Sequence, residues 1–520
     1  MKNNILTTFA STLILSTIFF SVFAFGGERS NTAGLSMGRI FVASGRGLEA
    51  IGTNPANLTL PHRGSASEVV NEEVTHDTLI VVKDSSGVDT SYTVSVTHDT
   101  SFVIVSKPPT VSFSFPGLSF GQSFGSDFIN YDIYKRYFTG VPNSTGGRDP
   151  YDLNDDDKNE ILSIFPAGKA FTHLDFEMRY FGLTFHNDWL GDIGLSVTDK
   201  VAANLDIPKD YVRFALFGLD STGSMYDVTG TNVRAWYIRE YAFSYARPLP
   251  MLNYTYFKNV SAGIGVKVVH GYATVITEKY DATFGNTVDP DGGWALSGNF
   301  DTRILRSTSF DPDDDADEFD PIGTPAGTGI GFDIGVAADV YPAIRAAFSI
   351  TDLGSITWTK NTKETIGHGS FVITNPSNQA QLDTIKDAFA GRDTTTGEFS
   401  TDLASSLRLG ASVQVDQLPF IHSFPGRLLV TFEYHQGFNN APGNTTRARF
   451  AIGTEYRPAM WFPIRTGISM GGIDRFNWGA GFGFDFGGFN WNFGSENLGL
   501  VFSNNNWDQV SFGTSMIIRI

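Results

Sequence analysis

Apolar and polar residues alternate with a period of two along much of the C-terminal half of the chain. In the segment Phe476–Phe486, phenylalanine or tryptophan occupies most alternate positions, and glycine, asparagine or aspartate stands between them. Because successive side chains of a β-strand point to opposite faces, this pattern predicts a strand with one apolar and one polar or small face. The same pattern recurs in Ile330–Val336, Leu403–Val415, Leu428–Tyr434, Ala448–Tyr456, Ile464–Met470, Phe489–Phe493 and Val510–Ile520.

Charged residues occupy the polar face of these predicted strands, and large aromatic residues stand near the ends of the apolar face. A dry sandwich core would not accept such charges, whereas the wet lumen of a membrane barrel would, and terminal aromatics are typical of the girdles at a bilayer surface. We therefore predict an all-β fold, a transmembrane antiparallel β-barrel of about 14 strands (14 to 16) formed by residues 109–520. The predicted lumen-lining residues are Arg408, Arg427, Glu433, Arg447, Arg449, Glu455, Arg465, Asp485 and Arg519, and the predicted girdle residues are Tyr434, Tyr456, Trp478 and Trp491.

The first 24 residues have the pattern of a cleaved signal peptide. A short basic head is followed by an apolar run, and modest or small residues stand at the cleavage position Val22–Ala24. An uncleaved anchor helix is the alternative, since the run approaches the length that spans a bilayer. No other stretch is as long and apolar, so an exported chain of predicted strands is expected in the outer membrane of a Gram-negative cell, in contact with its lipid.

The composition excludes several classes of function. The 520 residues include 55 glycines and 45 phenylalanines but no cysteine, and the formal net charge is −18. Without cysteine there is no disulfide, no thiolate metal site and no thiol nucleophile. An acidic chain is poorly suited to bind nucleic acid, whose phosphates attract clustered Lys and Arg. The nine histidines show no metal-ligand spacing and no hydrolase motif is present, so we expect no metal, no cofactor and no enzymatic activity.

Two acidic segments and one further stretch are expected to lie in loops. Residues 152–160 fit a helix that is capped at Asn154 or Asp155 and ends near Pro166, and a calcium loop is the weaker alternative because glycine and glutamate are missing at the required positions. Residues 311–320 are expected to form a solvated loop, with metal binding as the alternative, and residues 378–391 a short helix.

Residues 25–62 do not alternate; they are rich in glycine and alanine and contain Asn54-Pro55-Ala56. This run, about 30 residues after the signal peptide and ahead of a predicted barrel, resembles the outer-membrane long-chain fatty acid and hydrocarbon transporters (FadL/TodX-like). In that family the corresponding run folds inside the barrel as a hatch. The resemblance implies that residues 25–62 form a hatch, with Gly52, Asn54, Pro55 and Ala56 as its residues on the ligand path.

The resemblance also implies a function, which is passive uptake of a hydrophobic small molecule that leaves through a gap in the barrel wall. Residues 63–108, with strand-like stretches, are an insertion relative to that family. Some members of the family act instead as docking partners in outer-membrane protein-secretion complexes. A docking or shuttle role for a secretion-complex protein, with no small-molecule transport, is therefore the alternative, and the insertion is its expected partner surface. A structural barrel without a ligand is a third possibility.

Overall fold

The structure is a computed structural model of the 520-residue chain. It describes residues 29–61, 68–83, 89–105, 109–114, 118–128, 134–144, 147–149, 152–165, 168–219, 224–253, 257–288, 293–310, 323–341, 343–375, 381, 392–421, 423–473, 475–498 and 509–520. The predicted signal peptide, the acidic segment 311–320 and most of the predicted helix 378–391 lie outside these residues. No helix in the described part of the chain is long and apolar enough to cross a membrane.

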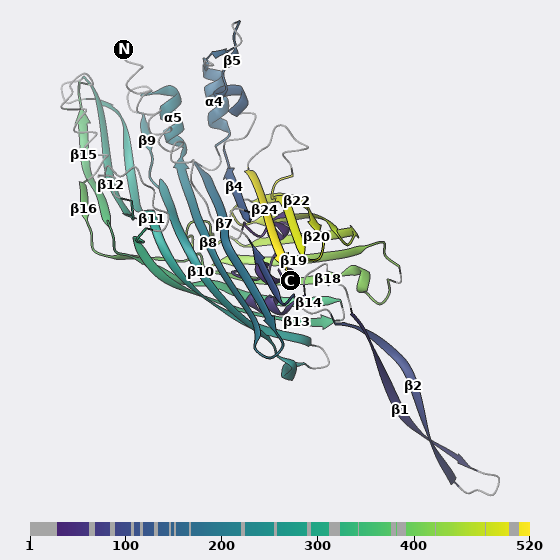
Figure 1. The fold of residues 1–520 in the computed structure, drawn as a ribbon. Helices are drawn as coiled ribbons and strands as arrows, with labels where there is room; N and C mark the ends of the chain where they lie inside the picture. The colour runs from purple at the N-terminus through teal and green to yellow at the C-terminus, as the bar shows by residue number, and fades with distance from the viewer. Residues whose placement is uncertain are drawn as a thin grey trace.

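Antiparallel strands close into a barrel with fourteen positions in its described wall, as the alternation predicts (Figure 1). β3 and β4 share one position, and β24 pairs with both of them to close the ring. In order around the ring, the wall consists of β3 (Val111–Ser114) with β4 (Phe120–Ser126), β7 (Lys169–Asn187), β8 (Gly191–Pro208), β10 (Asn232–Pro248), β11 (Lys258–Val288), β13 (Gly327–Tyr341), β14 (Ile344–Trp358), β18 (Ser406–Gln414), β19 (Arg427–Gly437), β20 (Arg449–Ala459), β21 (Phe462–Gly471), β22 (Phe476–Asp485), β23 (Phe489–Ser495) and β24 (Gln509–Arg519).

The two faces of the wall differ as the sequence pattern predicts. Large apolar side chains on the outer face are exposed, among them Ile330, Phe332 and Ile334 on β13, while Asp333 between them and Gly335 after them point inward. The strand predicted over Leu403–Val415 begins only at Ser406, because the chain leaves the ladder at 403–405 between β17 (Phe399–Asp402) and β18.

The two ends of the barrel carry connections of different length. At the end where β24 finishes, here called the short-turn end, β7 joins β8 and β13 joins β14 through turns of only a few residues. The opposite end, here called the long-loop end, carries the long connections, as the top of Figure 1 shows. The long connections contain a π-helical turn (Tyr134–Phe138), β5 (Val141–Pro142), β6 (Arg148–Asp149), α4 (Asp155–Ser163), α5 (Lys209–Phe217), β9 (Met225–Asp227), β12 (Trp294–Thr308), β15 (Lys363–Ile373), β16 (Arg392–Thr395) and β17. At the short-turn end, two 3-10 turns are formed by Pro250–Leu252 and Val415–Gln417.

The predicted helix at 155–163 is confirmed as α4. The Asn154 side chain accepts a hydrogen bond from the Asp157 N–H, and the Asp157 carboxylate accepts one from the Asn154 N–H, which together make a capping box. Asp157 is therefore engaged at the helix N-terminus. α4 also contacts α5 through a small apolar cluster that includes Tyr137 and Ile161.

The insertion forms a long hairpin of β1 (Glu68–Lys83) and β2 (Asp89–Val105), and the strand-like stretches noted in the sequence lie in these two strands. The hairpin projects away from the barrel at the short-turn end, at the lower right of Figure 1. In the described part of the chain its two strands pair only with each other. A two-stranded hairpin is marginally stable on its own.

Residues 29–61, here called the N-terminal segment, lie inside the barrel. They form α2 (Thr32–Ser36) and two 3-10 turns, η2 (Gly47–Glu49) and η3 (Pro55–Thr59). α2 contacts β21–β24, and η3 contacts β8, β10, β11 and β13, so the segment bridges opposite parts of the wall. Nearly all of its residues are buried.

Candidate functional site

Glycines on the inner wall face the N-terminal segment wherever its backbone approaches closely. A Cβ atom at Gly263 would lie 2.5 Å from the Pro55 carbonyl carbon, and one at Gly335 would lie 2.0 Å from Asn54 Oδ1. Gly453 and Gly467 face the Met37 backbone at similarly short range. These wall positions admit the segment because they carry no side chain. Part of the high glycine content therefore reflects the fit between wall and segment.

The Asn54-Pro55-Ala56 motif begins η3 and is held from both sides. Asn54 Oδ1 accepts a hydrogen bond from the Ala56 N–H at 3.2 Å and caps the turn, while Asn54 Nδ2 donates to the Val42 carbonyl at 2.8 Å. The wall contributes Ser349, whose hydroxyl donates to the Thr53 carbonyl. Gly52, with φ of +77°, turns the chain just ahead of the motif and faces the Lys267 ammonium.

Glu433 of β19 binds the N-terminal segment through the backbone. Its Oε2 atom accepts the N–H groups of Phe41 at 2.6 Å and Val42 at 2.8 Å. Its Oε1 atom accepts Arg408 at 2.8 Å and lies 3.4 Å from Arg449, which also donates to the Arg39 carbonyl. A buried carboxylate with four nitrogen donors around it is fully compensated, so Glu433 anchors the segment to the wall.

A second ionic anchor lies at the start of the segment. Arg29 is almost completely buried and pairs with Asp175 of β7 at 2.8 Å and with Glu496, which follows β23. Arg39 reaches the same Glu496 at 3.3 Å. Both ends of the stretch 29–43 are thus tied to the wall by charged groups.

Most of the predicted lumen residues lie at buried positions of the wall strands. Arg408, Glu433, Arg449, Glu455, Arg465 and Asp485 are buried, and Arg519 is nearly so. Besides the Glu433 anchor they form a second network, in which Glu455 pairs with Arg457 and Arg465 while Asp485 pairs with Arg457 and Arg519.

Two of the predicted lumen residues lie elsewhere than expected. Arg447 is exposed in the loop before β20, because the strand begins two residues later. Arg427 is the first residue of β19 and only partly buried, since it lies at the end of the wall rather than inside it.

The sequence analysis missed an ionic layer in the middle of the lumen. Lys267 of β11 lies between Asp333 of β13, at 2.9 Å, and Asp352 of β14, and Lys200 pairs with Glu240 at 2.8 Å nearby. Asp333 stands among the glycines of its strand, and that inward position was the signal that could have revealed the layer.

A hydrophobic layer lies inside the lumen toward the long-loop end, and the sequence analysis missed it as well. It contains Ala202, Trp236, Ile238, Val269, Ala326, Ile356, Trp358 and Leu403, with Phe399, Ala404 and Ala441 packed against them. Gly271 and Gly327 leave the space that the Trp358 ring occupies. We refer to these eleven residues as the apolar layer.

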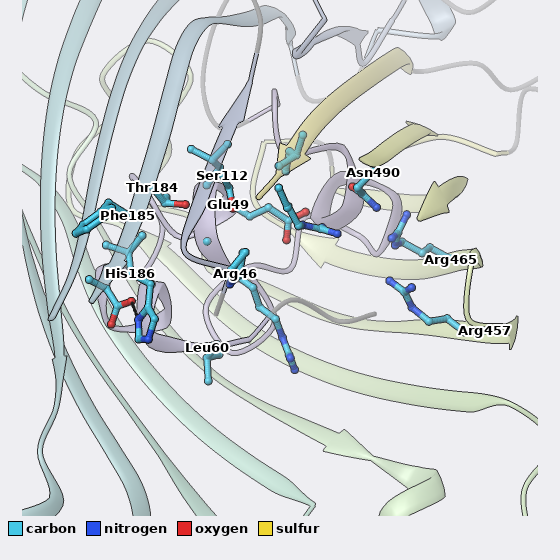
Figure 2. Close-up of a pocket in the computed structure, with 17 residues that line it drawn as sticks. Arg46, Glu49, Leu60, Ser112, Thr184, Phe185, His186, Arg457, Arg465 and Asn490 are labelled. Carbon is cyan, nitrogen blue, oxygen red and sulfur yellow. Dashed lines mark hydrogen bonds and ion pairs between the residues drawn. The ribbon is translucent and has the colours of Figure 1, made fainter. Parts of the chain in front are cut away.

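A small cavity lies between the N-terminal segment and the wall at the short-turn end, lined by charged and apolar side chains. Its volume of about 40 Å³ has room for roughly three water molecules. Figure 2 shows Arg46 and Glu49 of the segment among residues from both sides of the wall, including His186, Arg457 and Arg465. This end of the lumen is therefore lined by charged groups of both signs.

The register of the wall ladder is interrupted between β3 and β4, on either side of residues 115–117, which lie outside the described residues. The register against β24 shifts by three residues there, since Phe113 pairs with Ile518 but Phe120 pairs with Thr514. The Ser119 hydroxyl bridges the interruption through contacts with the N–H and carbonyl of Met516 at 3.3 and 3.5 Å. Leu48 of the segment and Ile517 of β24 share an apolar cluster with Ile51, Leu58, Ala50, Ala242 and Ala246 beside it.

Comparisons with known proteins found similar solved structures but no matching curated protein. The chain is similar to the toluene transporter TbuX of Ralstonia pickettii (TM-score 0.41, 11% identity, 96% of this chain and 98% of that chain). It is also similar to a FadL homologue of Pseudomonas aeruginosa (0.39, 11%, 95% and 98%) and to the toluene transporter TodX of P. putida (0.36, 10%, 79% and 91%). These barrels are of the FadL/TodX-like kind that the N-terminal run resembles.

A protein-family model covers most of the barrel. It matches residues 107–496 and therefore leaves out the N-terminal segment, the β1–β2 hairpin and β24. Its description is a family of unknown function, DUF5723. Because the match spans three quarters of the chain, this protein belongs to the DUF5723 family.

Proposed function

We propose that this chain is an outer-membrane barrel for the passive uptake of small hydrophobic molecules. The observation that carries the proposal is the filled lumen, in which a tightly fitted N-terminal segment and an ionic layer stand where a porin would have water. A charged or strongly polar solute would need an open aqueous pore. The free energy of an apolar solute is instead lowered when its surface leaves water for a route lined by protein side chains.

The outer surface of the wall supports a position in the membrane. Exposed Val, Ile and Phe side chains cover the outward positions of the wall strands, whereas exposed ion pairs join β11, β12 and β15 where these strands extend beyond the ring. There Lys279 pairs with Asp301, and Arg303 pairs with Glu364. Short turns at one end and long loops at the other match the periplasmic and extracellular ends of outer-membrane barrels.

The route we propose leaves the barrel sideways. At the short-turn end, the cavity lined by Arg46, Glu49 and Arg465 would expose a hydrocarbon to charged groups. The interruption between β3 and β4 adjoins the apolar side of the same cavity, which Leu48 and Ile517 line. A solute that passed there would move from apolar side chains directly to lipid. The residues Gly52, Asn54, Pro55 and Ala56 would act as the hatch that opens this route.

The test combines uptake with conductance. Purified protein in liposomes is expected to accelerate the entry of naphthalene but not of glucose of similar mass. Deleting residues 25–56 is expected to leave an inserted barrel that conducts small ions in a planar bilayer, because the lumen would then contain water. Equal naphthalene entry with and without protein would contradict uptake, and unchanged conductance after the deletion would contradict the plug.

A second candidate function, docking in a secretion complex, is favoured by the β1–β2 hairpin. The hairpin projects from the short-turn end and lies outside the family match, and its strand edges are available for pairing. The backbone register pairs Glu68–Lys83 with Asp89–Val105 along almost their whole length, with one irregularity between Asn71 and Glu73. A docking role predicts that deleting residues 68–105 removes a co-purifying protein and leaves naphthalene entry unchanged. Loss of naphthalene entry with no change in co-purifying proteins would argue against docking.

A further inference from the structure

The side chain of Lys267 on β11 is held between two carboxyl groups from the next two strands of the ring. Its Nζ atom lies 2.9 Å from Asp333 Oδ1 on β13 and 2.5 Å from Asp352 Oδ1 on β14. The side chains of Lys267 and Asp333 are each 1% exposed, and that of Asp352 is 8% exposed. We refer to these three residues as the triad. A primary amine is thus in contact with two carboxyl groups at a place that water hardly reaches.

The ionic layer contains one carboxyl group more than it has amines. Lys200 pairs with Glu240 at 2.8 Å, which leaves the single amine of the triad to compensate both of its acids. A buried charge without a partner is costly, and burial favours the neutral form of an acid. One carboxyl group of the triad is therefore expected to carry a proton.

The hydrogen bonds of the triad place this proton on Asp333. Its Oδ1 atom contacts Lys267 and accepts the backbone N–H of Asp352 at 2.9 Å. Its Oδ2 atom is buried and has no hydrogen-bond partner in the described part of the chain. An ionised oxygen without a donor costs more there than the hydroxyl of a carboxylic acid. Asp352 then remains the carboxylate that faces the Lys267 ammonium.

We propose that Lys267 and Asp333 form a covalent isopeptide bond in the folded barrel. Asp352 Oδ1 takes a proton from the ammonium, and the resulting amine attacks Cγ of the Asp333 carboxylic acid. The N–C bond forms, the C–O bond to Oδ2 breaks, and Oδ2 leaves as water with a proton that the nitrogen gives up through Asp352. The products are one amide, one water molecule and a protonated Asp352. The net charge of the triad is zero before and after the reaction, and no oxidant or other reactant is consumed.

The backbone of Asp352 supplies the donor that this reaction needs. Negative charge develops on Asp333 Oδ1 as the amine attacks, and the Asp352 N–H already donates to this atom. Asp352 has a φ of +57°, which residues other than glycine rarely adopt, and the register of β13 against β14 shifts at the same place, between Phe332 and Ile334. This departure from the regular ladder allows one residue to direct both its N–H and its carboxylate at the triad.

Glycines of the wall leave the room that the two reacting side chains occupy. A Cβ atom at Gly265 would lie 3.1 Å from Asp333 Oδ2. A Cβ atom at Gly331 would lie 2.8 Å from Leu403 Cδ1 and 3.7 Å from Lys267 Cβ, so the apolar layer adjoins the triad. Such surroundings exclude water and favour the uncharged amine and acid over the ion pair.

The bond would tie β11 to β13 on the inner side of the wall, across the long excursion through β12 that separates these strands in the sequence. It closes the chain between Lys267 and Asp333 into a loop that persists after unfolding, and a covalent loop of this kind stabilises a fold as a disulfide does. The chain has no cysteine with which to form a disulfide. Lys200 and Glu240 keep the layer ionic after the reaction, and the bond does not depend on the proposed uptake function.

The measurement is the intact mass of the denatured protein after purification from membranes. The mass is expected to be lower than that of the mature sequence by one water molecule, and a protease digest is expected to contain the Lys267 and Asp333 peptides as one joined species. Lys267→Arg, prepared in the same way, is expected to have its full sequence mass, because a guanidinium does not attack a carboxylic acid. Asp352→Asn removes the base and is expected to lower the joined fraction at least tenfold. Lys200→Arg is the matched control and is expected to keep the bond.

The outcomes on the unmodified protein decide the proposal even if a variant fails to fold. A full sequence mass, with the Lys267 and Asp333 peptides recovered separately, would refute the bond. A joined species that links Lys267 to Asp352 would refute the assignment of Asp333 as the acid that is attacked. Loss of water that persists in Lys267→Arg would show that another reaction causes it, and would refute the bond as well.

Electrophoresis of the fully denatured chains gives a second readout. A chain with a covalent loop is more compact when unfolded, so the unmodified protein is expected to migrate faster than Lys267→Arg after boiling in detergent. Lys200→Arg is expected to migrate like the unmodified protein. Equal migration of the unmodified protein and Lys267→Arg would count against the bond.

Discussion

Replacing Glu433 by glutamine is the sharpest test of how the N-terminal segment is held. The substitution keeps the size of the side chain but removes the charge that compensates Arg408 and accepts the N–H groups of Phe41 and Val42. The wall ladder around Glu433 consists of backbone bonds to β18 and β20, which the change leaves in place. The expected consequence is therefore a loosened segment within an intact barrel.

The size of the effect follows from the contacts. A hydrogen bond to a charged acceptor contributes about 1.5–3 kcal/mol and one to a neutral acceptor about 0.5–1.5 kcal/mol, so weakening the two bonds from the Phe41 and Val42 N–H groups should cost about 2–3 kcal/mol. At about 1.4 kcal/mol for each factor of ten, the equilibrium between docked and undocked segment should shift by roughly one and a half to two orders of magnitude. A segment that is undocked so much more often should let ions pass the lumen in bursts.

The assay is single-channel recording in planar bilayers. Glu433→Gln is expected to show frequent conductance bursts, and the unmodified protein only rare ones. Glu278→Gln is the matched control, since Glu278 is partly exposed and lies on the outward ion-pair face of β11. Resistance of the folded barrel to detergent on a cold gel shows that the variant still folds. A folded Glu433→Gln protein with the burst frequency of the unmodified protein would refute the anchoring argument.

Three further changes test the fit of the segment and the exit route. Gly263→Val is expected to lower the midpoint of thermal unfolding and raise burst frequency, because overpacking against Pro55 costs about 1–3 kcal/mol, while Gly397→Ala, with open space around it, should change neither. Asn54→Ala removes the cap of η3 and should cost about 1 kcal/mol, seen as a smaller rise in burst frequency than Glu433→Gln gives. A short thiol crosslinker between Ser119→Cys and Met516→Cys should slow naphthalene entry into liposomes without changing its binding, and an unchanged entry rate would rule out exit at this interruption.

The barrel could be predicted from the sequence because its C-terminal strands are short and two-sided. In β22 every outward position except Ala480 is a large aromatic, so one face of the strand is apolar while the other, with its glycines, asparagine and aspartate, faces the lumen. The inward row of charges was also predictable, since charged side chains such as Glu433 and Arg465 can lie within a membrane-spanning strand only if they face the lumen. Arg427 and Arg447 were misplaced because strand ends shift by one or two residues without changing the pattern.

The contents of the lumen could not be predicted in the same way. The glycines of β22 were visible as small residues, but only the structure shows that Gly481 makes room for Ser36. Trp236 and Trp358 stand at inward positions, where the alternation rule predicts polar residues, so the apolar layer has no signature in periodicity. The path of the loop 438–448 across the lumen depends on a contact between Gly443 and Ala202, which are far apart in the sequence.

The order of the layers constrains any route through this barrel. From the long-loop end, the loop of residues 438–448 comes first, then the apolar layer, then the ionic layer around Lys267, which faces Gly52 of the N-terminal segment. Under the proposed uptake function, a hydrocarbon in the apolar layer would not be stabilised by the charges beyond it. Further movement would then require Gly52 and η3 to shift, so that the apolar cluster around Leu48 becomes continuous with the layer above. A hatch of this proposed kind would explain why wall glycines rather than charged residues face Asn54 and Pro55, because neutral contacts can break and re-form without exposing an ion.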